Sequence, residues 1–148
     1  MSEESKTWEF WGYESQAEGH PVQIWFDGLP IEAKEEIIDL VEHLRVMVDR
    51  QWRSPEFDPL VGAGGISELR PADIRCQEGT LTYRIYGWRG YPDEWSYTFL
   101  YGARKEVKND REGKAIAKRR LEDLAAGRAT VHRFDFEKQS DSETESGA

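Results

Sequence analysis

The sequence predicts a single α+β domain, in which an N-terminal strand and a helical hairpin pack on a small antiparallel sheet and a further helix lies near the C-terminus. Two observations favour this fold class. Apolar residues recur at helical spacing in two stretches. In the stretches between them, side chains alternate with the two-residue period that is typical of a strand. A length of 148 residues and a hydrophobic share of 38% fit one hydrophobic core.

The N-terminal part of the chain is expected to form the first strand and the helical hairpin. Trp8–Tyr13 is an aromatic run that favours a strand. Pro21 suits the first turn of a short helix that extends to about Asp27, and a strand over residues 22–26 is the alternative. A second helix begins at Pro30, and its apolar face consists of Ala33, Ile37, Leu40, Val41, Leu44 and Val48.

Three strands are predicted after a loop that reaches Gly65: Ile66–Arg70, Thr80–Gly87 and Trp95–Gly102. The second and third have two faces, because successive side chains of a strand point to opposite sides. The connector between them contains glycine and proline, which predicts a hairpin with a long loop. In the third strand one face is expected to hold Trp95, Tyr97, Phe99 and Tyr101.

The C-terminal helix has signals at both ends. Asn109 and Glu112 have the spacing of a capping box, and Gly127 stands where a helix commonly ends. Thr130–Phe136 is expected to add an edge strand. Residues 1–6 and 137–148 contain few apolar side chains and are expected to be disordered, which leaves residues 7–136 as the domain.

Composition excludes several classes of protein. No run approaches the roughly 18 apolar residues of a membrane span, the first residues do not resemble a signal peptide, and a single cysteine, Cys76, indicates a cytoplasmic protein. The histidines His20, His43 and His132 lack the spacing of a metal site, so no metal or other cofactor is expected.

Charge is distributed unevenly along the chain, whose net charge is −9. Residues 7–69 hold thirteen acidic and four basic side chains, whereas residues 70–136 hold ten acidic and fourteen basic ones. An acidic protein can still bind phosphate on a local basic face. The second half of the domain is therefore the expected place for such a face.

Arg70 and Arg84 are the main candidates for an anion site. If their strands are antiparallel neighbours, both guanidiniums can grip one phosphate, which guanidinium binds bidentately. Arg104, Lys105 and Lys108 would extend the positive field at the exit of the third strand. The alternative is that Arg70 and Arg84 are surface arginines paired with carboxylates such as Glu68 or Asp73.

These residues resemble a known family. Glu68-Leu69-Arg70, Tyr83-Arg84, Leu100-Tyr101-Gly102 and Lys105 occur in an order and approximate spacing similar to the phage-derived HigB-like branch of the RelE/ParE toxin superfamily. The resemblance covers about residues 8–126 and extends to the helix that carries the sequence AIAKRRLEDL. The chain departs from the pattern at Tyr101, Ala103 and Glu106, where the family often has His, Phe and a second Lys.

The resemblance implies a RelE-like fold and a ribosome-dependent mRNA endonuclease that uses the 2′-hydroxyl of the RNA and needs no metal. Arg70 and Arg84 would then stabilise charge on the phosphate, and Lys105 would act as a cation or proton donor. Tyr101 and His132 are the acid–base candidates. RNA binding would involve Arg104, Lys108 and Trp88, the last by stacking on a base.

The resemblance also implies partners: a cognate HigA-like antitoxin, the ribosome and mRNA. Two alternatives remain open at this stage. The chain could be a RelE-fold phage or prophage protein that binds a host protein without cutting RNA, which its acidic surface and the lost second Lys favour. It could also be a ParE-like toxin directed at gyrase.

Overall fold

A computed structural model of the protein describes residues 7–48, 52, 56–60, 64–77, 79–106 and 110–137. Three helices and eight strands occur within these residues. In chain order they are β1 (Glu9–Glu14), α1 (Pro21–Asp27), α2 (Ile31–Arg45), β2 (Phe57–Pro59), β3 (Ile66–Leu69), β4 (Ile74–Cys76), β5 (Gly79–Leu81), β6 (Tyr83–Arg89), β7 (Ser96–Arg104), α3 (Arg111–Ala125) and β8 (Thr130–Arg133).

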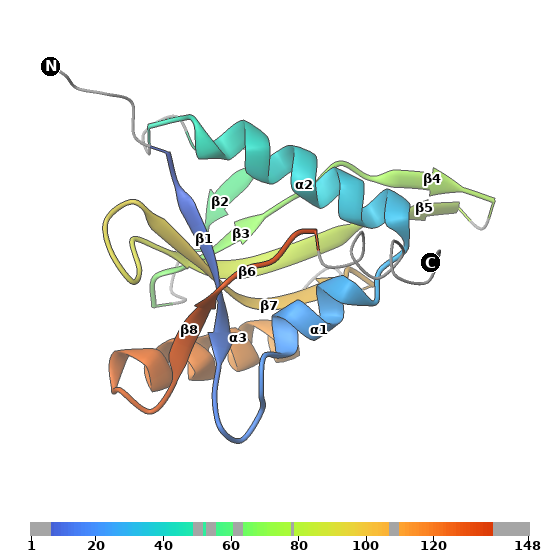
Figure 1. The fold of residues 1–148 in the computed structure, drawn as a ribbon. Helices are drawn as coiled ribbons and strands as arrows, with labels where there is room; N and C mark the ends of the chain where they lie inside the picture. The colour runs from blue at the N-terminus through green and yellow to red at the C-terminus, as the bar shows by residue number, and fades with distance from the viewer. Residues whose placement is uncertain are drawn as a thin grey trace, which may run out of the picture.

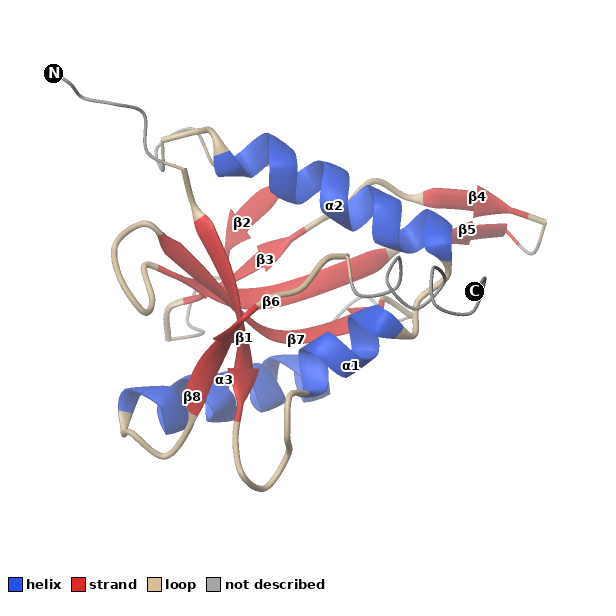
Figure 2. Cartoon of the chain, in the orientation of Figure 1, coloured by secondary structure: helices blue, strands red, loops and turns tan. Residues whose placement is uncertain are grey.

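Six of the strands form one twisted sheet in the order β2-β3-β6-β7-β1-β8 (Figures 1 and 2). Neighbours are antiparallel except β1 and β7, which run parallel. The α+β class is therefore confirmed, and the expectation of a purely antiparallel sheet is wrong at one pair. Parallel strands need a long crossover, and here the whole segment from α1 to β6 supplies it.

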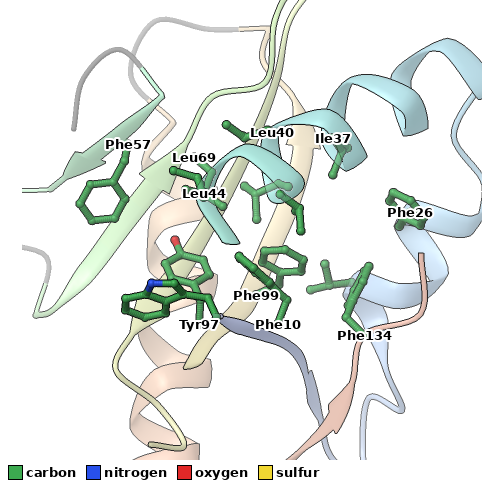
Figure 3. Close-up of a cluster of buried hydrophobic side chains, with 14 of the residues drawn as sticks. Phe10, Phe26, Ile37, Leu40, Leu44, Phe57, Leu69, Tyr97, Phe99 and Phe134 are labelled. Carbon is green, nitrogen blue, oxygen red and sulfur yellow. The ribbon is translucent and has the colours of Figure 1, made fainter. Parts of the chain in front are cut away.

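Helices cover both faces of the sheet. The core under α1 and α2 is aromatic: Phe10, Tyr97 and Phe99 from the sheet meet Phe26 from α1 and Ile37 from α2 (Figure 3). Its other main contributors are Trp8, Leu40, Val41, Leu44, Trp52, Leu69, Ile85 and Phe134.

The second core lies beneath α3 and is smaller. It joins Tyr13, Ile66, Tyr86 and Leu100 of the sheet to the apolar face of the helix, which consists of Ala117, Leu121 and Leu124. Burying apolar side chains on both faces at about 25 cal/mol per Å² is the main stabilising contribution to such a fold. Three layers result, with the sheet in the middle.

A β-bulge divides β7 into two parts, and the alternation of side chains between the two faces of the sheet is interrupted where they meet. Tyr86 pairs with Tyr101 but Gly87 pairs with Phe99, so Leu100 is one residue more than the pairing needs. Leu100 and Tyr101 consequently both contact the core under α3, whereas Tyr97 and Phe99 lie in the core on the other face. The predicted alternation holds up to Phe99 and is wrong for Tyr101.

Several predicted boundaries need correction. The expected strand over Thr80–Gly87 is interrupted at Thr82, and β5 pairs with β4 in a separate two-stranded hairpin. Strands β2 and β4 were not expected. The side chain that caps α3 is Asp110, whose Oδ1 accepts from the backbone N–H of Gly113 at 2.9 Å. Asn109 lies outside the described residues, as do residues 1–6 and 138–148.

Other predictions are confirmed. Residues 21–27 form a helix, not a strand, and α2 begins one residue after Pro30. Gly127 has φ +80° directly after Ala126, the C-cap of α3, a conformation that glycine adopts without steric cost. The last strand lies at the edge of the sheet.

Candidate functional site

Arg70 and Arg84 come together because β3 and β6 are antiparallel neighbours. Leu69 pairs with Ile85, so the next position along each strand brings Arg70 beside Arg84. Arg84 lies within β6, and Arg70 follows the last residue of β3. Both side chains are mostly covered, with 30% of the Arg70 side chain and 18% of the Arg84 side chain exposed.

A carboxylate joins the two guanidinium groups. Glu68 Oε1 lies 3.3 Å from Arg70 Nη2, and Glu68 Oε2 lies 2.8 Å from Arg84 Nε. Arg70 Nη2 also donates to Asp58 Oδ2 at 2.7 Å, and Arg84 Nη1 donates to the carbonyl oxygen of Tyr83 at 2.9 Å. The predicted juxtaposition and the alternative carboxylate pairing with Glu68 are thus both present. Two positive and two negative charges meet at this point.

A cavity of about 550 Å³ lies beside this cluster, between α2 and the segment that follows β3. Arg70 and Arg84 line it together with His43 of α2. Four carboxylate residues also line it: Glu36, Asp39, Glu56 and Asp73. The cavity is thus water-accessible and large enough for a phosphate group, but its surroundings are more acidic than the sequence pattern of the basic half suggested.

Tyr101 lies on the face of the sheet that α3 covers, with its ring stacked on Tyr86 at a centroid distance of 5.9 Å. Burial raises the pKa of Tyr101 above its usual value, and the carboxylates of Asp110 and Glu112 raise it further. Burial and Asp110, which accepts a 3.2 Å hydrogen bond from the Tyr86 hydroxyl, raise the pKa of Tyr86 as well. Both phenols therefore keep their protons at neutral pH, which makes Tyr101 a poor base.

His132 is not part of the same site. It lies on β8, opposite Gly12 of β1, and three strand spacings separate β8 from β6, a distance of about 14 Å. Its ring meets His20 edge to face at a centroid distance of 5.7 Å. The structure therefore does not bring His132 to Arg70 and Arg84.

The remaining predicted residues are spread around the sheet. Arg104 is exposed and paired with Glu106 at 2.7 Å, and the backbone N–H of Lys105 donates to Thr82. Trp88 stacks on Tyr91 with a centroid distance of 4.4 Å and nearly parallel rings, and it is partly buried against the core under α3. Lys108 lies outside the described residues.

His43 is the site residue that sequence reasoning missed. It was expected on the polar side of its helix, and it is exposed there. The helical spacing that buries Leu40 and Leu44 leaves His43 on the neighbouring stripe, next to Asp39 one turn earlier. Only the position of α2 across from the segment that follows β3 shows that this stripe lines the cavity.

Two further classes of site were searched among the described residues. No three His, Cys, Asp or Glu side chains there are grouped so as to bind a metal ion, and none of the described helices combines the length and the apolar character of a membrane crossing. Comparison with known proteins gives no match, whether to protein-family models, to curated proteins or to solved structures.

Proposed function

We propose that the protein is the toxin of a type II toxin–antitoxin system, that it has a RelE-like fold, and that it cleaves ribosome-bound mRNA. One observation carries the proposal: Arg70 and Arg84, which the sequence resemblance singles out, lie side by side on adjacent strands and both line one open cavity. The succession of an N-terminal strand, two helices, antiparallel strands and a further helix is also what the resemblance leads us to expect. Cytoplasmic action and a HigA-like antitoxin belong to the same proposal.

In the proposed reaction the 2′-oxygen of the RNA attacks the adjacent phosphorus, the bond to the 5′-oxygen breaks, and a 2′,3′-cyclic phosphate forms. The 2′-hydroxyl loses a proton, and the 5′-oxygen gains one. Arg70 and Arg84 stabilise the negative charge that grows on the phosphate oxygens, which is the largest contribution in most such sites. No metal is required, because the nucleophile belongs to the substrate.

Proton transfer needs a base and an acid near the phosphate. His43 lines the cavity with both arginines, and histidine is the side chain that most often transfers protons near neutral pH. Tyr101 is protonated at neutral pH, but it lies beneath α3, on the other face of the sheet from α2, and it does not line the cavity, so it is not positioned for this step. Lys105 is the remaining donor that the resemblance implies. His132 has no place in this step because of its distance.

Induced expression tests the proposal. The wild-type chain is expected to stop growth and to cut ribosome-bound mRNA, whereas Arg70→Ala/Arg84→Ala is expected to do neither. A second variant, Arg70→Lys/Arg84→Lys, keeps both charges but loses the bidentate geometry, and it is expected to retain little cleavage. Normal growth and intact mRNA with the wild type would refute the nuclease proposal. Growth arrest without mRNA cleavage would instead indicate a ParE-like toxin.

A second candidate function is a RelE-like protein that binds another protein and has no nuclease activity. The observation that favours it is the acidity of the cavity, since Glu68 and Asp58 neutralise the two arginines and four more carboxylate residues line the walls. Such a surface repels a polyanion and attracts basic side chains. Wild-type expression without toxicity, together with capture of a defined protein that Asp39→Lys abolishes, would support this candidate.

A further inference from the structure

Glu68 is the one carboxylate residue among the buried polar and charged residues of the part of the chain that the structure describes, with 6% of its surface exposed. Its strand β3 is paired on both sides, to β2 at Asp58 and to β6 at Tyr86. Pairing on both sides holds the backbone of Glu68 in place, and its side chain is buried there. A buried carboxylate is stable only where cations or hydrogen bonds compensate its charge.

The compensation comes from the two arginines of the candidate site. Each carboxylate oxygen of Glu68 contacts a different guanidinium, one from β3 and one from β6. The contacts described for Arg70 and Arg84 involve fewer than the five N–H donors that each guanidinium carries. The carboxylate therefore fixes two long side chains relative to each other without exhausting their capacity to bind an anion.

We propose that Glu68 is a positioning residue, which holds the guanidinium groups of Arg70 and Arg84 in one orientation so that a single phosphate group contacts both at once. The inference rests on the proposed function for the nature of the substrate. It differs from a simple neutralising role, in which Glu68 competes with phosphate for the same cations. The two roles predict opposite effects when the charge of Glu68 is removed.

Binding of inorganic phosphate, followed by NMR of the arginine Nε–Hε groups, separates the two roles. In the wild type, phosphate is expected to shift the signals of Arg70 and Arg84 with one shared dissociation constant. Glu68→Gln is expected to weaken phosphate binding on the order of tenfold, because two long side chains must then be ordered on binding. Single Arg→Lys variants assign the two signals.

Glu56→Gln is the matched control. Glu56 lines the same cavity, and the ion pairs described for Arg70 and Arg84 do not include it. Removing its charge is expected to tighten phosphate binding through electrostatics alone. Tighter binding with Glu68→Gln, by as much as with Glu56→Gln, would overturn the positioning role. So would the absence of any phosphate-induced shift at either arginine in the wild type.

Thermal unfolding of each variant shows whether it folds. If Glu68→Gln does not fold, the wild-type titration decides, because two different dissociation constants at the two arginines contradict a shared clamp. The outcome is separate from that of the cleavage assay. A chain that binds phosphate as described but leaves mRNA intact retains the inference and loses the proposed function. A chain that cleaves mRNA, but in which Arg70 and Arg84 respond to phosphate with different dissociation constants, retains the proposed function and loses the inference.

Discussion

Gly87 tests the packing around the bulge in β7, and we predict that Gly87→Ala strongly destabilises the fold. A Cβ atom at this position would collide with the ring of Tyr97 and lie 2.6 Å from the backbone oxygen of Thr98, whereas ordinary contact begins at 3.4 Å. Neither neighbour can move easily. Tyr97 is fully buried and its hydroxyl is hydrogen-bonded to Ser67 at 2.9 Å, and Thr98 belongs to a central strand.

The expected loss follows from this overpacking. Inserting a methyl group into a tight core costs about 1–3 kcal/mol, and we place Gly87→Ala at the upper end, at about 3 kcal/mol, because backbone is one of the obstacles. At roughly 4 °C per kcal/mol for a domain of this size, the midpoint of thermal unfolding should fall by about 12 °C. Circular dichroism and urea unfolding give the two quantities independently.

Gly28→Ala is the matched control for the same change in side chain. Gly28 has φ −89°, and an added Cβ would meet only two backbone oxygens at 3.7 and 3.8 Å, which is ordinary contact. This substitution is expected to shift stability by less than about 1 kcal/mol, in the stabilising direction. If Gly87→Ala and Gly28→Ala unfold at the same temperature, the ring of Tyr97 does not lie against Gly87 and the description of the bulge is wrong.

Three further predictions concern α3, alkaline pH and the chain after β8. Asp110→Ala should cost about 1–2 kcal/mol and speed amide exchange at Gly113, because the helix loses its cap; unchanged exchange would contradict this. The raised pKa of Tyr86 means that the unfolded chain loses this proton near pH 10 and the folded chain does not. Stability is therefore fully present below pH 10 and falls above it by up to about 1.4 kcal/mol per pH unit. Urea titrations at pH 9 to 11 should show a shallower fall for Tyr86→Phe than for the wild type. Phe134→Ala should cost about 3–4 kcal/mol, because this ring is buried against Phe26 and Phe99; a loss below 1 kcal/mol in urea unfolding would place the ring outside the core.

The local parts of the fold were predictable from sequence. The helical spacing of apolar residues in α2 and α3 predicts which side of each helix faces the sheet. Pro30 and Gly127 indicate helix ends because of their own backbone preferences. The cap of α3 was predicted one residue too early, because Asn109 and Asp110 are both good capping residues and only the backbone path selects between them.

The non-local parts were not predictable from one sequence. The position of β1 between β7 and β8 depends on which strands meet, and no residue of β1 specifies this. The extra residue at Leu100 is invisible in an alternating pattern, so Tyr101 was placed on the wrong face. In the candidate site, the meeting of Arg70 and Arg84 followed from two adjacent antiparallel strands. The acidic wall did not, because Glu36 and Asp39 come from a helix far away in sequence.

The place of β1 has a consequence for how the chain folds. Among the strands that the structure describes, β1 is synthesised first, and its two partners, β7 and β8, are synthesised last. Closing so long a loop has a high entropic cost and slows folding. During synthesis β1 therefore remains unpaired, with its aromatic side chains unburied by the sheet, until nearly the whole domain has left the ribosome. Assembly of this protein is thus a late and collective event.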